Sequence, residues 1–221
     1  MHDMTENQQA VTLEPQQPAQ AAVIWMHGLG ADGHDFVPIV KELDFSSKQH
    51  TRFIFPHAQV LPVTVNGGME MRAWYDILQI DLVRRVDGKG ILQSVERIAG
   101  LIREQVEKEI PLDQIVLAGF SQGGVIALHT ALQLNLQVAG VMALSTYLPI
   151  RETLDTNINL PIFLAHGTED GVVPYAESHS ALQWLKQHGH EVEFHDYLMM
   201  HNVIPEEITD IAAWLNKVLA A

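Results

Sequence analysis

The sequence contains no cysteine among its 221 residues. This absence excludes a disulfide framework, a zinc–thiolate site, an iron–sulfur cluster and a cysteine nucleophile. Basic residues are also few, because Lys and Arg total 13 against 27 Asp and Glu, which gives a formal net charge of −14. Such a charge repels nucleic acid and anionic lipid surfaces, so we expect no nucleic acid among the partners.

Long apolar runs are missing as well. The longest ones, Ala21–Met26 and Val138–Leu144, are much shorter than the roughly 20 residues that a membrane-spanning helix needs. The first residues have neither a cationic stretch nor an apolar core, so no signal peptide is expected. Together with the lack of cysteine, these features predict a cytoplasmic chain that is not an integral membrane protein.

Short apolar runs alternate with helical patterns from residue 21 onward. The runs are typical of strands buried on both faces of a parallel sheet; they lie at Ala21–His27, Arg52–Pro56, Ile115–Phe120, Val138–Ser145 and Pro161–His166, with an alternating edge strand at Glu191–Tyr197. Apolar residues three or four apart predict helices at Lys89–Ile110, Gln122–Leu134, Tyr175–His188 and Pro205–Leu219. This alternation predicts a doubly wound α/β fold, a mostly parallel central sheet with helices on both faces.

The first 20 residues differ from the rest of the chain in composition. They are rich in Gln, Pro and Ala, which predicts a loosely ordered segment with a candidate edge strand at Ala10–Glu14. No internal repeat or linker interrupts residues 21–221. These residues are therefore expected to form a single catalytic domain.

One glycine-rich motif suggests a nucleotide site. Gly28, Gly30 and Gly33 match G-x-G-x-x-G after a predicted strand, the context of a dinucleotide-binding turn. Such a site needs an acidic residue about 20 positions later, and the stretch Phe53–Ala58 contains no carboxylate. The residues that follow Gly30 also favour a loop over the start of a helix. Nucleotide binding is therefore the weaker interpretation.

A second motif indicates a nucleophile. Gly119, Ser121 and Gly123 match G-x-S-x-G between the predicted strand Ile115–Phe120 and a predicted helix. A sharp turn at this point needs small neighbours and exposes the serine at the helix N-terminus, at the edge of the sheet. The alternative is an ordinary turn in which the serine only caps the helix. The motif alone leaves both open.

A serine alcohol needs a base and an orienting acid, which on this type of fold follow in the order Ser, Asp or Glu, His. Glu169 and Asp170 both follow the predicted strand Pro161–His166, and spacing alone does not separate them. His201 follows the last predicted strand, where the base is expected. His27 and His166 each precede a glycine at a strand end, and we expect them to form local hydrogen bonds instead.

At this point the sequence resembles the acyl-protein thioesterase and bacterial carboxylesterase family, the phospholipase/carboxylesterase group of α/β-hydrolases. The resemblance runs from about Ala21 to Leu219. It depends on several blocks in the same order: His27–Gly30 with Asp32–Asp35, Phe55–Ala58, Met71–Ile77, Gly119–Gly124, Leu144–Ser145 with Tyr147–Pro149, His166–Gly167 with Asp170, Val173 and Pro174, and Tyr197, Met199 and His201.

The resemblance implies an α/β-hydrolase fold without a large cap domain, and it implies roles for single residues. Ser121 corresponds to the nucleophile, Asp170 to the acid and His201 to the base. The backbone N–H groups of Leu29 and Gln122 correspond to the two oxyanion donors. The family's chemistry needs no cofactor and no metal.

The implied activity is that of a serine esterase that hydrolyses carboxylic esters or acyl thioesters through an acyl-enzyme intermediate. Acyl-protein thioesterase or lysophospholipase activity is the alternative main function, so the candidate substrates are a small-molecule ester or thioester, an acylated protein and a lysophospholipid. Homodimers occur among similar proteins, which makes a second copy a candidate partner. A non-catalytic hydrolase-fold binding protein is a remote alternative, because every member of the triad is present.

The connection Val60–Asp87 is expected to be a long loop, and it is too apolar for a solvated one. Its side chains either pack the loop onto the domain or form the wall of an acyl-binding groove. The second interpretation, which the resemblance supports, places in that groove Trp74, Ile77, Leu78, Val172 and Val173.

Two further features concern access to the site. Only about 15 residues, Thr146–Leu160, connect two predicted strands at the position where many relatives insert a helical lid, so we expect an open site. Beside His201, Leu198 and Met200 stand where family members more often have Pro and Gly. These bulkier residues bear on loop shape and substrate fit rather than on the chemistry.

Overall fold

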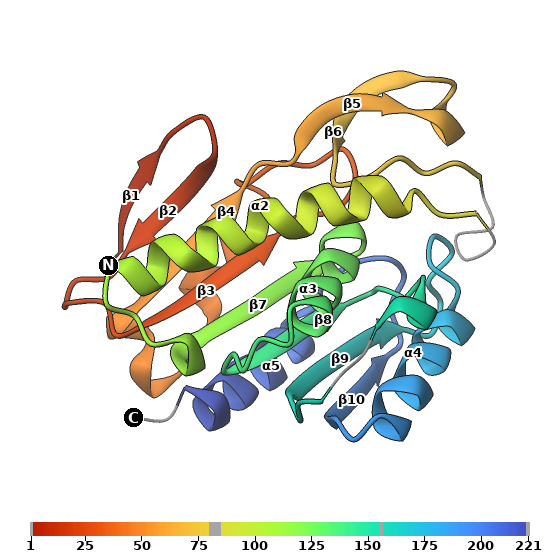
Figure 1. The fold of residues 1–221 in the computed structure, drawn as a ribbon. Helices are drawn as coiled ribbons and strands as arrows, with labels where there is room; N and C mark the ends of the chain where they lie inside the picture. The colour runs from red at the N-terminus through yellow and green to blue at the C-terminus, as the bar shows by residue number, and fades with distance from the viewer. Residues whose placement is uncertain (1, 80–84, 155–156, 220–221) are drawn as a thin grey trace.

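A computed structural model of the chain describes residues 2–79, 85–154 and 157–219. Within these residues eight strands form one sheet in the order β1-β2-β4-β3-β7-β8-β9-β10 (Figure 1). They are β1 (Asp3–Glu6), β2 (Ala10–Glu14), β3 (Ala21–Met26), β4 (Thr51–Pro56), β7 (Ile115–Phe120), β8 (Gly140–Leu144), β9 (Pro161–Gly167) and β10 (Glu191–Tyr197). From β4 to β10 all neighbours are parallel, whereas β1 and β2 are antiparallel. The predicted mostly parallel α/β architecture is confirmed.

Helices cover both faces of this sheet, as Figure 1 shows. They are α1 (Ile39–Glu42), α2 (Gly88–Glu107), α3 (Gln122–Gln133), α4 (Tyr175–Gln187) and α5 (Pro205–Val218). Two apolar cores result, one beneath α2, α3 and α4, the other beneath α1 and α5. In β3, Ile24 and Met26 belong to the first core, and Val23 and Trp25 to the second. Burial on both faces explains why these strands are apolar throughout.

The N-terminal segment differs from the expectation. Residues 3–6, predicted to be loosely ordered, form β1 and pair in register with β2, from Asp3 opposite Glu14 to Glu6 opposite Val11. As a result, β2 lies inside the sheet and β1 is the edge strand. All four residues of β1 are exposed. This strand therefore depends on backbone pairing, which leaves no apolar pattern in the sequence.

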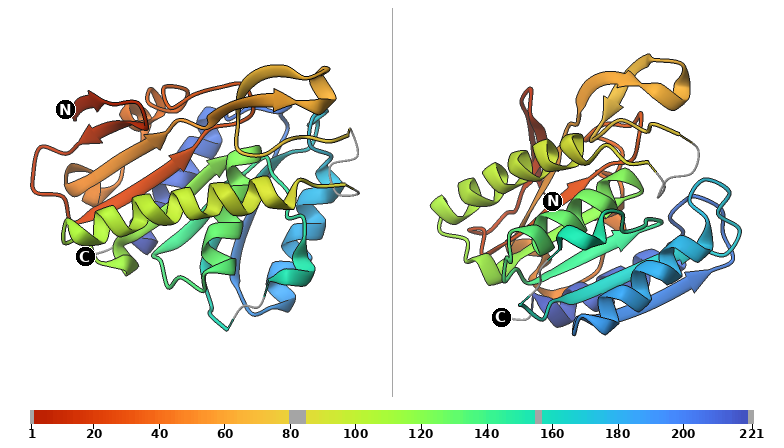
Figure 2. Two further views of the ribbon diagram at one scale, coloured as in Figure 1. Left: turned by 45° about the horizontal axis from the view of Figure 1, so that its top comes forward. Right: turned by 45° about the vertical axis from the view of Figure 1, so that its right-hand side comes forward.

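The connection expected to be a long loop contains a second, two-stranded sheet. β5 (Gln59–Val63) and β6 (Met69–Ala73) pair antiparallel around a turn in which Gly67 and Gly68 have φ of 68° and 79°. Both angles favour glycine. Figure 2 shows that this hairpin projects from the body of the molecule. Residues 80–84, in the later part of the connection, lie outside the described residues.

The connection between β8 and β9 is short. In its described residues, 145–154 and 157–160, it contains a single 3₁₀ turn, η4 (Arg151–Thr153), and no longer helix. None of the described helices combines the length and the apolar character needed to cross a bilayer.

Candidate active site

Ser121 lies in a sharp turn between β7 and α3. Its φ and ψ are 55° and −119°, a conformation that is strained for any residue with a side chain and that is found at functional sites. Its N–H donates to the Leu144 carbonyl at 2.9 Å, and its carbonyl accepts from the Thr146 hydroxyl at 2.7 Å. The Ser121 side chain makes no capping hydrogen bond. The neighbouring strand therefore holds the strained backbone and leaves the hydroxyl free of a cap.

The glycines around Ser121 allow this turn to form. A Cβ at Gly119 would lie 2.1 Å from the Gly123 carbonyl oxygen, and one at Gly123 would lie 2.2 Å from the Met26 carbonyl oxygen. A Cβ at Gly124 would lie 2.7 Å from the Thr146 Cβ. These contacts are too close for any side chain, so the start of α3 rests directly on the end of β3.

Asp170 and His201 meet across two loops at the same end of the sheet. His201 Nδ1 lies 2.7 Å from Asp170 Oδ2, and the Asp170 side chain is fully buried. The two loops are also joined through the backbone, since the Glu169 N–H donates to the Met199 carbonyl at 3.1 Å. Glu169 itself is exposed. Of the two acids that spacing could not separate, the structure brings Asp170 to the histidine.

Backbone groups keep the Asp170 carboxylate charged. The N–H groups of Val172 and Val173 donate to its Oδ1 at 2.8 and 2.9 Å. Burial raises the pKa of Asp170, but the hydrogen bond from His201 and those from Val173 and Val172 outweigh this, so its pKa lies below the usual value. The group is therefore ionised at neutral pH and can orient an imidazole.

His201 lies against the serine turn. Its ring centroid is 4.7 Å from that of Phe120, the residue before Ser121. The His201 side chain is 16% exposed to solvent. His166, in contrast, is fully buried and donates through Nε2 to the Val173 carbonyl at 2.9 Å. It serves the acid loop locally, as expected from its place before a glycine.

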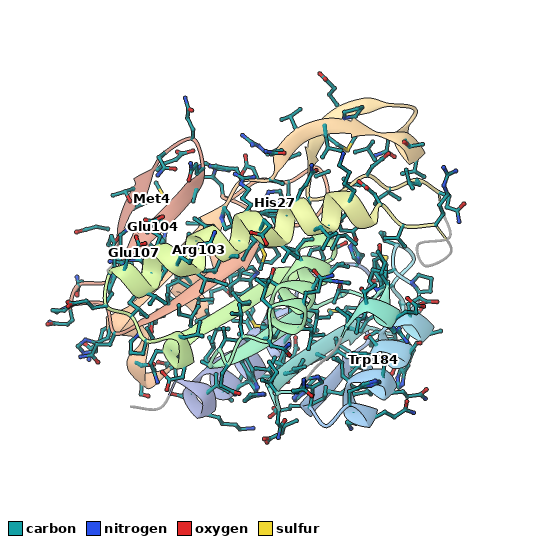
Figure 3. All side chains as sticks on the ribbon, viewed as in Figure 1. Met4, His27, Arg103, Glu104, Glu107 and Trp184 are labelled. Atoms are coloured by element: carbon teal, nitrogen blue, oxygen red, sulfur yellow. The ribbon has the colours of Figure 1, made fainter. Side chains whose placement is uncertain are left out.

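The loop after β3 passes beside the serine. A Cβ at Gly28 would lie 3.6 Å from the Ser121 Cβ, which brings the backbone of Leu29 near the nucleophile. His27 (labelled in Figure 3) donates through Nδ1 to the Gly28 carbonyl at 2.7 Å and accepts at Nε2 from the Ala58 N–H at 3.0 Å. Burial lowers the pKa of His27 to about 4, so the ring is neutral at neutral pH and can keep both bonds.

The same loop explains the motif that resembled a nucleotide site. A Cβ at Gly33 would lie 2.4 Å from the Phe55 carbonyl oxygen, and the Gly33 N–H donates to His57 Nδ1 at 3.1 Å. The next α-helix, α1, begins only at Ile39. The glycines therefore serve close packing of the loop, and no helix starts where a dinucleotide would need one.

The five residues predicted to form an acyl groove lie in different surroundings. Ile77 and Leu78 line a cavity of about 10 Å³, roughly the size of one water, whose described lining does not include the other three. Trp74 and Val173 are buried, each 2% exposed, and Val172 is 61% exposed. Beside the base, Leu198 and Met200 are exposed by 85% and 72%. Of the five, Ile77 and Leu78 are thus the two that this cavity brings together.

Gln122 is expected, from the resemblance, to contribute its backbone N–H. Its N–H lies in the first turn of α3, where no intrahelical acceptor exists, so it is free to bind an anion. Its side chain is also buried: Oε1 accepts from the Trp74 N–H at 3.1 Å, and Nε2 donates to the Tyr75 carbonyl at 2.8 Å. A large amide inside the glycine-rich turn of an apolar helix is the sequence signal that could have indicated this second role.

Comparison with known proteins agrees with this geometry. A profile of the phospholipase/carboxylesterase family matches residues 7–219. The chain belongs to this family. Acyl-protein thioesterase 1 of Mycosarcoma maydis is 39% identical over 91% of this chain and 92% of its own length; the protein of that name from Cryptococcus neoformans is 34% identical over 94% and 96%. The crystal structure of SOBER1 from Arabidopsis thaliana superposes with a TM-score of 0.84 at 27% identity, covering 91% of this chain and all of that one.

Membership of the phospholipase/carboxylesterase family confirms the class of the enzyme. The chain is a serine hydrolase that acts on ester or thioester bonds. It also confirms the α/β-hydrolase fold that the resemblance implied.

Proposed function

We propose that Ser121, His201 and Asp170 form a catalytic triad that hydrolyses acyl esters and thioesters through an acyl-enzyme. The observation that carries the proposal is the 2.7 Å hydrogen bond between His201 and the buried Asp170, beside a serine with a strained backbone. A serine on such a turn has its hydroxyl at the helix N-terminus, where developing negative charge is stabilised.

The reaction proceeds in two halves. The Ser121 hydroxyl oxygen attacks the acyl carbon while His201 Nε2 takes the proton, and Asp170 stabilises the imidazolium through Nδ1–H. The backbone N–H groups of Leu29 and Gln122 donate to the oxyanion of the tetrahedral intermediate. His201 then gives the proton to the leaving alcohol or thiol. Water attacks the acyl-enzyme in the same way and releases the carboxylic acid, and Ser121 recovers its proton.

The relatives indicate an acylated protein as the substrate class, since the two described above are named acyl-protein thioesterase 1. We infer that Ile77 and Leu78, which are partly exposed, contact the acyl chain. Trp74 and Val173 are buried and are not included. Small esters, small thioesters and lysophospholipids are the further candidates. The single catalytic domain over residues 21–221, the cytoplasmic location and the homodimer stay predictions.

Hydrolysis of matched substrates tests this proposal. The wild-type chain is expected to release nitrophenol from p-nitrophenyl butyrate and free thiol from a peptide carrying an S-acylated cysteine. Ser121→Ala is expected to abolish both while circular dichroism stays unchanged. If the folded wild-type chain hydrolyses neither substrate, the proposed function is wrong. If it cleaves only the oxygen ester, the protein-thioester substrate is excluded.

A further inference from the structure

The Gln122 side chain connects the two loops that supply the proposed oxyanion donors. The backbone N–H of Gln122 is one donor. Its side-chain Oε1 accepts from the Trp74 N–H at 3.1 Å, and its Nε2 donates to the Tyr75 carbonyl at 2.8 Å. The Trp74 indole then donates to the His27 carbonyl at 2.8 Å. His27 directly precedes Gly28 and Leu29, the second donor.

Each link in this connection is buried. Gln122 and Trp74 are both 2% exposed, and His27 and Tyr75 are both 1% exposed. Further hydrogen bonds hold the segment of Trp74 and Tyr75 in place. The Ser94 hydroxyl donates to the Trp74 carbonyl, and the Tyr75 and Tyr147 hydroxyls form a hydrogen bond of 2.9 Å. A buried amide whose oxygen and nitrogen both have backbone partners is held in one orientation.

We propose that Gln122 is a positioning residue whose side-chain amide, through Trp74, sets the separation of the Leu29 and Gln122 N–H groups. This inference rests on the proposed function, since it concerns the same oxyanion site. It adds a side-chain role to the backbone role that the resemblance implies for Gln122. Direct packing of Gly123 against the end of β3 is the competing way to fix the same separation, and the two make opposite predictions.

Steady-state kinetics with p-nitrophenyl acetate distinguishes them. Gln122→Ala and Gln122→Met both remove the amide, and Met keeps the volume. Both variants are expected to lower kcat by about 10-fold to 100-fold, with KM within about twofold, because donors aimed at the oxyanion act in the transition state. Gln133→Ala, at the other end of α3, is the matched control and is expected to leave kcat unchanged. Full activity of Gln122→Met would overturn the proposal.

A double-mutant cycle tests the connection through Trp74. Trp74→Phe keeps an aromatic ring and removes the indole N–H, so its kcat is expected to fall by a similar factor. If both residues act through one connection, the double variant Gln122→Met with Trp74→Phe loses no more than about twofold beyond the larger single loss. Fully multiplicative losses would mean that the two side chains act separately, which contradicts the proposal.

Hydrogen exchange separates this inference from the proposed function. In Gln122→Met the Trp74 amide loses its acceptor and is expected to exchange at least about tenfold faster than in the wild type, whether or not the chain hydrolyses the chosen ester. Unchanged exchange would overturn the positioning role even if Ser121 is the nucleophile. Faster exchange in Gln122→Met, combined with a folded wild-type chain that hydrolyses no ester, would instead overturn the proposed function alone.

Discussion

His201 and Asp170 are joined by a 2.7 Å hydrogen bond although 31 residues separate them in the chain. The bond exists because the loops after β9 and β10 lie side by side and share backbone hydrogen bonds, from the Thr168 N–H to Tyr197 at 2.8 Å and from the Glu169 N–H to Met199 at 3.1 Å. The acid and the base are thus fixed by the parallel pairing of two strands.

Asp170→Asn is expected to lower kcat by about 10⁴, because an amide favours the wrong tautomer of His201. Glu169→Gln is the matched control, since it changes the adjacent exposed acid and is expected to alter kcat by less than about threefold. Steady-state rates with p-nitrophenyl butyrate provide the comparison. A larger loss for Glu169→Gln would reverse the assignment of the acid.

Gly123→Ala is expected to destabilise the fold, because the new Cβ would lie 2.2 Å from the Met26 carbonyl oxygen. We expect a loss of at least about 1–3 kcal/mol in the free energy of unfolding. Gly100→Ala, in the interior of α2, is the control: the closest contact of its Cβ is an Arg103 side-chain nitrogen at 3.8 Å, and it is expected to be neutral or stabilising. Urea denaturation compares the two, and equal stabilities would contradict the close packing.

Leu78→Ala tests the acyl-binding side of the site. Each methylene that loses its apolar contact costs about 0.8 kcal/mol, which is about fourfold in kcat/KM. We therefore expect a loss of about fourfold or more for a medium-chain p-nitrophenyl ester and little change for the acetate. Leu92→Ala, exposed on α2, is expected to affect neither. Equal losses for both esters would mean that Leu78 is structural.

The buried Glu207 predicts how stability depends on pH. Burial, with a further contribution from Asp210, raises its pKa from 4.5 to about 8, and the Ile204 N–H opposes this shift. Between these values the unfolded chain has released a proton that the folded chain keeps, so stability falls as pH rises.

Glu207→Gln removes this titration. Its gain in the free energy of unfolding over the wild type is expected to grow between pH 5 and pH 8, reaching on the order of a few kcal/mol. Glu206→Gln, at the exposed neighbouring position, is expected to show no such growth. Denaturation curves at the two pH values measure the difference. A gain that stays constant would contradict the raised pKa.

The sequence predicted the features that follow from periodicity and from order along the chain. Continuous apolar runs identified the buried strands, and G-x-S-x-G identified the turn at Ser121. It could not predict β1, because a strand stabilised by backbone pairing alone has no apolar pattern. The hairpin of β5 and β6 was not predicted for a related reason. Three of the five residues of β5 are exposed, and exposed and buried residues do not alternate along the strand.

Side-chain contacts between distant parts of the chain also could not be predicted from the sequence. Glu207 lies in the first turn of α5, where an exposed acid would complement the helix dipole, and only the folded chain shows that it is fully buried. Trp74 was expected to face a groove, whereas its indole N–H donates to the buried His27 carbonyl. Spacing along the chain contains no information on which of two acids turns inward, which is why Glu169 and Asp170 could not be separated by it.

Labelling with a fluorophosphonate, which forms a covalent bond with an activated serine, tests the central claim most directly. Mass spectrometry of the intact chain and of its peptides is expected to find one adduct per wild-type chain, on Ser121. The adduct is expected to be missing in Ser121→Ala and to form much more slowly in Asp170→Asn. An adduct on another residue, or undiminished labelling of Ser121→Ala, would show that Ser121 is not the nucleophile.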